Sequence, residues 1–342
     1  MVRYEVDLLP QAIAVGDFNN DNHIDIVASN QDYLGTISVL LGYGNGSFAR
    51  KTTYQTGAQP QGILIGDFNG DNQSDLIVAN YGVNESLSIF FGHGDGTFTN
   101  QTIMPSPRTP TFGAVYDFNH DGCLDFIMTF LTDRMVSIYL GHGNGSFSIP
   151  MTFSAGYSSY YMTLGDFNND NQIDIVVSNI EYSGVSSMSI LLGYGNGSFS
   201  VYQTFASGIS PDAIVTSDFN GDNNLDLAVV CPSSNSTKIL FGYGNGSFAN
   251  PISYATGFRP FGLCLGDFNS DNQTDIAVVS LFSDGISIHL GFGNGSFTTQ
   301  IKVGSNITGS DIRAADFNGD GRLELVNTNW GGTSVGVFLN NC

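Results

Sequence analysis

The sequence predicts an all-β fold, a seven-bladed β-propeller that forms one domain over residues 1–342, and three observations support it. A nine-residue motif, first seen at Asp17–Asp25, occurs seven times, and its first residue recurs at spacings of 50, 50, 49, 52, 49 and 49 residues. Each repeat contains short apolar segments of strand length that end at turn-forming residues. No segment shows the periodicity of a helix. A period near 50 residues over the whole chain is typical of a closed or stacked repeat architecture.

The repeat that contains Asp67 shows how four strands arise in each unit. Residues 61–66 form a short apolar strand A, and residues 76–80 are apolar at consecutive positions, as in a strand B buried on both faces. Residues 87–90 alternate like a half-buried strand C. The turn Gly92–Phe98 follows, and its Asp-Gly pair predicts an antiparallel strand D. Four antiparallel strands in each of seven repeats describe a seven-bladed β-propeller.

The two ends of the chain predict how the ring closes. The last repeat supplies strand A at 311–315, strand B at 323–327 and strand C at 334–339, but the chain ends before a strand D. Tyr4 precedes Pro10 by the same spacing as Tyr54 precedes Pro60, which places the N-terminal segment in the register of a strand D. We therefore expect this segment to complete the last blade.

The seven motifs place oxygen-bearing side chains at positions 1, 3, 5 and 9, which is the spacing of a calcium-binding loop. Ca²⁺ prefers six to eight hard oxygen ligands, and a short loop offers alternate side chains and the backbone carbonyl of position 7. Position 6 is Asn or Gly in every motif, and these residues adopt a left-handed backbone most readily. The alternative is a polar hairpin turn rich in Asp and Asn, but such a turn needs only one or two of these residues.

The predicted Ca²⁺ ligands include position 7 of each motif through its backbone carbonyl. They are Asp17, Asn19, Asp21, His23 and Asp25; Asp67, Asn69, Asp71, Gln73 and Asp75; Asp117, Asn119, Asp121, Cys123 and Asp125; Asp166, Asn168, Asp170, Gln172 and Asp174; Asp218, Asn220, Asp222, Asn224 and Asp226; Asp267, Asn269, Asp271, Gln273 and Asp275; and Asp316, Asn318, Asp320, Arg322 and Glu324. The Phe at position 2 of every motif is expected to anchor the loop on the core.

The negative charge of the chain lies in these motifs. The formal net charge is −21, from 31 Asp and Glu against 10 Lys and Arg. Three acids in each of seven motifs make 21, and the remaining 10 acids match the 10 basic residues. Carboxylates crowded in one short loop repel one another unless a cation lies between them. Seven Ca²⁺ would leave the chain at about −7, an ordinary value for a soluble domain.

The order of strands predicts which face binds a ligand. In an A-B-C-D meander the motifs share one face with the glycine-rich turns, and the loops that vary among repeats lie on the other face. Variable loops on a rigid scaffold are a usual place for recognition, and exposed aromatic and Arg side chains suit binding. The candidates are Trp330, Tyr81, Tyr182, Phe282, Arg108, Tyr157, Tyr160, Phe258 and Arg259. The alternative is that the aromatic side chains pack under their own loops.

Other features argue against several partners. The chain has no basic stripe for nucleic acid and no run of 18 apolar residues for a membrane span. Its cysteines form no CxxC pair, so a zinc site is not expected, and the pairing of Cys123, Cys231, Cys264 and Cys342 stays open. Residues 1–6 lack the apolar core of a signal peptide, so we expect an excised domain or a chain without its secretory signal. The domain is expected to be monomeric.

The DFNxD(N/G)xxD motifs followed by LGxGNGSF turns resemble the FG-GAP-like repeat family, of which the VCBS repeat is a variant. The resemblance covers essentially the whole chain, and integrin α-subunit propellers and certain seven-bladed fungal lectins are similar in architecture. It implies that positions 1, 3, 5 and 9 bind Ca²⁺, although Glu324 departs from the Asp of position 9. It also implies a role in adhesion, ligand binding or sugar binding outside the cell.

A binding function is favoured over catalysis. Active sites generally depart locally from a repeat, and no Ser, Cys or His of this chain stands in such a setting. The leading hypothesis is an extracellular, calcium-stabilised propeller that binds a protein or glycan ligand through its variable face. An extracellular location also fits because calcium sites of extracellular modules often have Kd values of roughly 10⁻⁴–10⁻³ M. The alternatives are a structural spacer without a specific ligand and, least favoured, a polysaccharide lyase or hydrolase.

Overall fold

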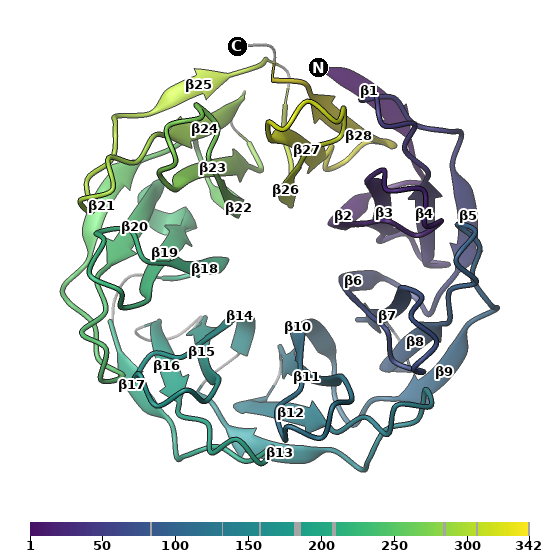
Figure 1. Ribbon diagram of the computed structural model, residues 1–342, viewed down its shortest axis with the longest axis horizontal. Coiled ribbons are helices and arrows are strands. Elements are labelled where there is room, and N and C mark those ends of the chain that lie inside the picture. Colours follow the sequence, from purple (N-terminus) through teal and green to yellow (C-terminus); the bar gives the residue numbers. More distant parts are fainter. Residues whose placement is uncertain are drawn as a thin grey trace.

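The structure is a computed structural model that describes residues 1–82, 84–131, 133–156, 159–180, 186–206, 210–282, 285–305 and 307–340. In these ranges the chain forms seven four-stranded antiparallel sheets, which stand as blades around a central axis (Figure 1). The one helix in these ranges is a single 3-10 turn, η1 (Pro232–Ser234). The predicted all-β, seven-bladed fold is confirmed.

Each blade runs from an innermost strand beside the axis to an outermost strand at the rim (Figure 1). The first three blades contain β2 (Pro10–Gly16), β3 (Asp25–Asn30), β4 (Thr36–Leu40) and β5 (Thr52–Gln55); β6 (Pro60–Gly66), β7 (Asp75–Asn80), β8 (Ser86–Phe90) and β9 (Thr102–Pro105); and β10 (Pro110–Tyr116), β11 (Asp125–Phe130), β12 (Met135–Tyr139) and β13 (Met151–Ser154). The next three contain β14 (Ser159–Gly165), β15 (Asp174–Asn179), β16 (Ser187–Leu191) and β17 (Gln203–Phe205); β18 (Ile214–Ser217), β19 (Asp226–Cys231), β20 (Ser236–Leu240) and β21 (Ile252–Ala255); and β22 (Pro260–Gly266), β23 (Asp275–Ser280), β24 (Ile286–His289) and β25 (Ile301–Val303). The last blade contains β26 (Ile312–Ala315), β27 (Glu324–Thr328), β28 (Ser334–Phe338) and β1 (Val2–Glu5).

The N-terminal segment closes the ring as predicted. β1 pairs antiparallel with β28, with Val2 opposite Val337 and Glu5 opposite Ser334. Figure 1 shows β1 at the rim of the blade whose inner strands come from the C-terminal end of the chain. The ring of Tyr4 meets that of Phe48 edge-on at 5.1 Å, so the closing strand also packs on the first blade. Strand exchange thus joins the two ends of the sequence.

The hydrophobic core lies between neighbouring blades. Leu87 and Ile89 of β8 pack with Phe126 of the third blade, whereas Phe90 of the same strand packs with Val27 of the first. The sequence predicts a half-buried third strand, but β8 is buried at all five positions. That prediction is wrong because a blade covers each face of this strand, and Ser88 is accommodated by hydrogen bonds with Asn80 (2.9 Å) and Gln101 (2.7 Å).

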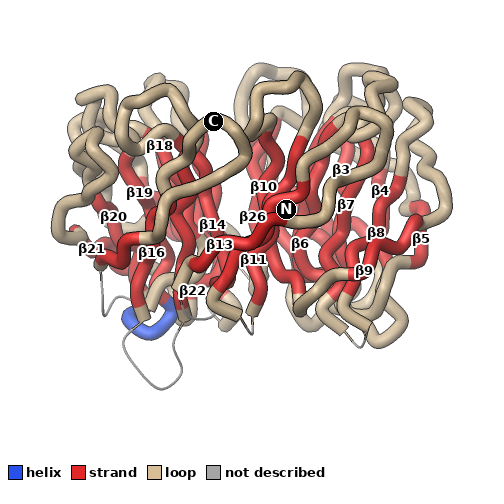
Figure 2. Tube along the Cα trace, turned by 90° about the horizontal axis from the view of Figure 1, so that it is seen from below, coloured by secondary structure: helices blue, strands red, loops and turns tan. Residues whose placement is uncertain are grey.

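Loops cover both ends of the ring (Figure 2). One end, which we call the channel face, carries η1 and the other connections between the second and third strands of the blades. The opposite end, the loop face, carries the seven nine-residue motifs, hereafter the motif loops, and six glycine turns. These turns are Gly42–Phe48, Gly92–Phe98, Gly141–Phe147, Gly193–Phe199, Gly242–Phe248 and Gly291–Phe297.

Candidate functional site

The backbone of the motif loops has the left-handed conformation predicted at position 6. The φ angles there range from 60° at Asn72 to 84° at Gly122. Position 4 is also left-handed in all seven loops, from 58° at Asn20 to 80° at Gly70. This second constraint was not predicted from the sequence, although five of the seven residues at position 4 are Asn or Gly. Two left-handed residues in nine bend the loop tightly on itself.

Hydrogen bonds bring the side chains of positions 1, 3 and 5 together. In the first loop, Asp17 Oδ2 accepts from the backbone N–H of Asn22 (2.8 Å), and Asp21 Oδ1 accepts from that of His23 (2.9 Å). The amide of Asn19 donates to Asp21 Oδ2 (2.9 Å). The other six loops repeat these three bonds. Three predicted ligands per loop are therefore neighbours.

The carboxyl group at position 9 joins two turns of one blade. Asp25 is fully buried, and its two oxygens accept backbone N–H groups from Phe18 (2.8 Å) and Gly42 (2.7 Å). Burial, reinforced by the acids at positions 5 and 1 of the loop, raises the pKa of Asp25 to about 6. Five further blades repeat both hydrogen bonds, through Asp75, Asp125, Asp174, Asp226 and Asp275.

Glu324 takes over this position in the last blade. Its Oε2 accepts from the backbone N–H of Phe317 (2.8 Å), as the shorter Asp does elsewhere. The described part of the last blade contains no glycine turn, and the backbone N–H of Asn340 donates to Glu324 Oε1 (3.4 Å) in its place. Glu324 departs from the Asp found at position 9 of the other motifs. Its longer side chain nevertheless keeps the hydrogen bond to the backbone of position 2.

Motif loops also contact the glycine turn of the next blade. Gly96 donates its N–H to the carbonyl of Phe18 (2.9 Å), and the rings of Phe18 and Phe98 meet edge-on at 5.6 Å. The same pair of contacts links every blade that has a turn to the blade before it. Since motif loops and glycine turns touch one another, their predicted location on one face is confirmed, as is the anchoring role of the position 2 Phe.

The donor types of the motif loops fit Ca²⁺. Carboxylate, amide and carbonyl oxygens are the hard ligands that this ion prefers. Oδ2 of Asp17 accepts one backbone N–H and keeps a second lone pair, whereas Oδ1 of Asp17 already accepts two and Oδ1 of Asp316 three. In the described residues, however, no group of three or more His, Cys, Asp or Glu side chains is placed so that it could hold a metal ion. Position 9 lies deepest and is already committed to two N–H groups, so positions 1, 3 and 5 are the more available side-chain donors.

Three of the position 7 side chains reach a neighbouring motif loop. Gln73 Oε1 accepts from the amide of Asn20 (2.6 Å) in the preceding blade. Asn224 accepts from Asn169 (2.9 Å) in the same way, and Gln172 pairs with His120 (3.0 Å). These contacts are compatible with the predicted role of position 7, which uses only the backbone carbonyl.

A pocket of about 720 Å³ opens on the channel face, within the size range of small-molecule sites. It is lined by Gln31, Gln61, Tyr81, Leu131, Tyr160, Ile180, Ser210, Pro211, Asp212, Pro232, Ser233, Asn235, Phe258, Arg259 and Phe261. Four of these residues, Gln61, Tyr160, Asp212 and Phe261, share one place in the repeat, six residues before a motif loop. The pocket therefore lies where innermost strands of several blades begin.

The structure places four of the predicted ligand residues in this pocket, namely Tyr81, Tyr160, Phe258 and Arg259. Trp330 lies outside it, half-exposed, with its ring edge-on to Phe282 at 5.8 Å. The guanidinium of Arg259 lies 5.4 Å from the centre of the Phe282 ring, so these aromatic side chains extend the rim of the pocket.

Of the other predicted ligand residues, Arg108 is not in the pocket lining. Arg108 forms an ion pair with Asp133 (2.7 Å). Tyr157 and Tyr182 lie outside the described residues.

The sequence analysis missed Asp212. This residue is buried, and its Oδ1 atom has no hydrogen-bond partner. Burial raises the pKa of its carboxyl group to about 8, although the charge of Arg259 opposes this shift. A strongly shifted acid in a cleft is a physical sign of a functional site. The sequence did contain a sign of this residue. Asp212 is an acid outside the motif loops, at a repeat position where Gln61 and Phe261 stand in other repeats.

The described residues also bear on a membrane span and on the cysteines. No helix in the described residues is long and apolar enough to cross a membrane. Cys123, Cys231 and Cys264 are free thiols, and Cys342 lies outside the described residues.

Comparisons with known proteins agree with this architecture. Solved structures with a similar fold include a lectin from Burkholderia pseudomallei, with a TM-score of 0.72, 14% identity and coverage of 98% of this chain and 97% of that one. A periplasmic gluconolactonase from Pseudomonas aeruginosa gives a TM-score of 0.61 at 16% identity, covering 86% of each chain. A functionally unknown protein from Desulfotomaculum acetoxidans gives 0.61 at 14% identity, covering 87% of this chain and 86% of that one. At such identities the likeness is one of fold.

No curated protein matches the chain by sequence. The model of the FG-GAP-like repeat matches residues 17–78, 67–128, 117–177, 218–278 and 278–326, which together make up more than half of the chain. The matched segments begin at or near the motif loops and run through the strands described above. The chain therefore belongs to the FG-GAP-like repeat family.

Proposed function

We propose that this protein is a calcium-stabilised recognition module that binds a glycan or protein ligand on its channel face. The observation that carries the proposal is the pocket of about 720 Å³ among residues that vary from repeat to repeat. A ring of similar blades would leave a symmetric channel, whereas this pocket combines aromatic, amide, carboxyl and guanidinium groups. Such a mixture of apolar walls and a few polar groups is typical of ligand sites.

In this proposal Ca²⁺ acts on the scaffold. The ion would be held by the side chains of positions 1, 3, 5 and 9 and the carbonyl of position 7, and it supplies the positive charge that three crowded acids lack. The motif loops lie on the face opposite the pocket and touch the neighbouring blades. Calcium is thus expected to govern folding more directly than specificity. We place the protein outside the cell because millimolar calcium fills sites of this class there.

A labelled protein on a glycan array in calcium buffer tests the binding function. Tyr160→Ala changes the pocket wall and Trp330→Ala changes the rim, while Tyr243→Ala removes an exposed ring from the loop face. We expect hits that Tyr160→Ala weakens and Tyr243→Ala leaves unchanged. Hits that depend on none of the channel-face residues would contradict the proposed binding face. A blank array together with no saturable binding of soluble glycans would contradict the glycan form and favour the structural spacer.

A further inference from the structure

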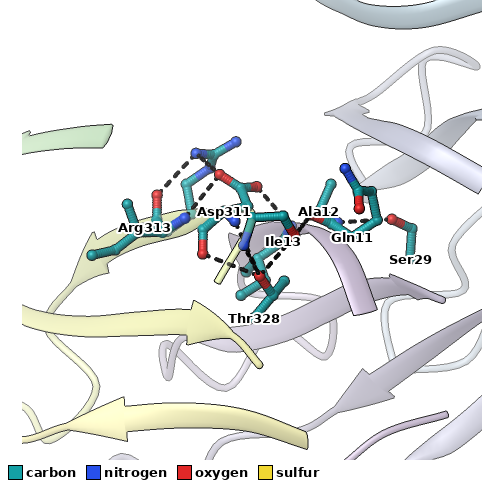
Figure 3. A network of polar contacts seen from close by, with 9 residues as sticks. Gln11, Ala12, Ile13, Ser29, Asp311, Arg313 and Thr328 are labelled. Carbon is teal, nitrogen blue, oxygen red and sulfur yellow. Dashed lines mark hydrogen bonds and ion pairs between the residues drawn. The ribbon is translucent and has the colours of Figure 1, made fainter. Parts of the chain in front are cut away.

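Two acids outside the motif loops are buried in the described part of the chain, and only one is paired. Asp311 accepts backbone N–H groups from Ile13 (2.8 Å) and Ile312 (2.9 Å) and forms an ion pair with Arg313 (2.6 Å). Figure 3 shows these contacts joining the last blade to the first. Asp212 lacks such donors, because its Oδ1 atom is unpartnered. Arg313 stands two residues after Asp311, whereas the apolar Ile214 stands two residues after Asp212.

A second unpartnered acceptor lines the same pocket. Gln61 is buried, and its Oε1 atom has no hydrogen-bond partner. Buried polar atoms of folded proteins are nearly always satisfied, and those that are not need an explanation. Of the eleven such side-chain atoms in the described residues, those of Asp212 and Gln61 line this cavity, and both are acceptors. A ligand that completes the site must therefore donate hydrogen bonds.

The walls and the charge of the pocket indicate which kind of hydrogen-bond-donating ligand fits it. Tyr160 and Phe261 stand edge-on at 6.5 Å, and Leu131 and Ile180 add apolar surface. The formal charges of the lining are one acid, Asp212, and one base, Arg259. At neutral pH the raised pKa keeps Asp212 protonated, so the lining carries the positive charge of Arg259 and disfavours a cation. A ligand cation would also have to enter beside the guanidinium of Arg259.

We propose that this pocket binds one neutral sugar ring, the terminal residue of a glycan, whose hydroxyl groups donate to Asp212 Oδ1 and whose C–H face lies against the aromatic wall. Gln61 offers a further acceptor to the same ligand. This inference rests on the proposed recognition function and names its ligand class. The raised pKa of Asp212 supports it, because a carboxyl group that stays protonated near neutral pH suits a neutral, hydroxyl-rich ligand better than an ammonium group.

Titration calorimetry with free monosaccharides tests the assignment. The probes are glucose, galactose, mannose, fucose and N-acetylglucosamine at millimolar concentration, with putrescine as the cationic competitor, all in calcium buffer. Asp212→Leu replaces the carboxyl acceptor by an apolar side chain of similar shape. The variant is expected to fold because the position is buried. Asp95→Asn is the matched control on the loop face, where other glycine turns already carry Asn.

We expect at least one sugar to bind the wild type and Asp95→Asn equally, with at least a tenfold loss in Asp212→Leu and no binding of putrescine. A sugar that binds Asp212→Leu as tightly as the wild type would overturn the role of Asp212 and leave glycan recognition elsewhere on the protein standing. Binding of putrescine without any sugar would overturn the ligand class. No binding of any sugar, with array hits that Tyr160→Ala does not affect, would overturn the pocket as the site.

Discussion

Asp212 makes the stability of this protein depend on pH. Burial raises the pKa of its carboxyl group to about 8, with Arg259 as the opposing charge, against about 3.9 in an unfolded chain. Between these values the folded protein holds a proton that the unfolded chain has lost, so stability falls as pH rises. Cys231 and Tyr161 have raised pKa values as well, because burial disfavours their charged forms, and they keep their protons throughout this window.

Asp212→Asn therefore removes a free-energy cost of folding, that of protonating the carboxyl group, which grows as pH rises. We expect the stability of the variant relative to the ligand-free wild type to rise by about 1.4 kcal/mol for each pH unit between pH 4 and pH 8, because the wild type alone must take up a proton to fold in this window. Urea denaturation at several pH values from 4 to 9 measures this difference. Asp95→Asn, at an exposed turn, should show no such trend. A stability difference that is constant over pH would contradict the state assigned to Asp212.

Single residues of the pocket were only partly predictable. Tyr81, Tyr160 and Arg259 were predicted because they vary among repeats on the face where the pocket opens. Asp212 was missed because the acids outside the motif loops balance the basic residues in number, and a balanced count says nothing about which acid is paired. Pairing depends on contacts across the channel, which the sequence does not contain.

At the level of the element, the motif loop is defined by its backbone as much as by its acids. Position 6 is left-handed in all seven loops, which explains the restriction to Asn and Gly. At Gly122 an added Cβ atom would meet no other atom within 4 Å. A substitution there changes the backbone preference and no packing contact.

Gly122→Ala should destabilise the protein by about 1–2 kcal/mol, the cost of a left-handed conformation for an ordinary residue. Gly122→Asn should cost clearly less, since Asn occupies this position in five other loops. Both variants restrict the unfolded chain similarly, so their difference isolates the folded backbone. Denaturation at fixed calcium concentration measures it. Equal losses would show that the φ angle is not what restricts this position.

The unit that joins blades is a motif loop with the glycine turn of the next blade. No such turn lies in the described part of the last blade, where the amide of Asn340 donates to the carbonyl of Phe268 (3.1 Å) in place of a turn glycine. Phe268 also has no turn Phe to pack against, and it is the one position 2 Phe that is not fully buried. Asn340 is therefore a substitute for the missing turn.

Asn340→Ala is expected to lower the free energy of unfolding by about 1 kcal/mol, the typical net value of one hydrogen bond. The control is Asn100→Ala, at an exposed residue that follows the glycine turn of the second blade, and it should have no effect. Both are compared by thermal melting under identical conditions. If Asn340→Ala and the wild type have the same melting temperature, the hydrogen bond from Asn340 to Phe268 does not take the place of a turn contact.

For the molecule as a whole, the repeat made most of the fold predictable. The period set the number of blades, and the register of Tyr4 relative to Pro10 predicted the closing strand that pairs with β28. The burial of β8 was not predictable from its alternating sequence, because it depends on two blades far apart in the chain. Similarly, the motif predicted a calcium loop but not that Asp25 and its equivalents hold two backbone N–H groups.

The net charge is also a property of the whole ring. Without cations the loop face concentrates 21 acids, and burial and mutual repulsion raise the pKa of Asp25 to about 6. A cation bound in each loop would reduce this repulsion and would stabilise the protein by binding the folded chain alone. The central claim is therefore that Ca²⁺ binding stabilises the propeller.

The melting temperature in excess chelator, compared with that in millimolar Ca²⁺, tests this claim most directly. Binding to the folded state alone stabilises it by about 2.7 kcal/mol per site when calcium is at 100 times Kd. We predict a melting temperature that is lowest in chelator and rises progressively with Ca²⁺, with Asp95→Asn following the wild type. The same melting temperature in excess chelator and in saturating Ca²⁺ would contradict the account.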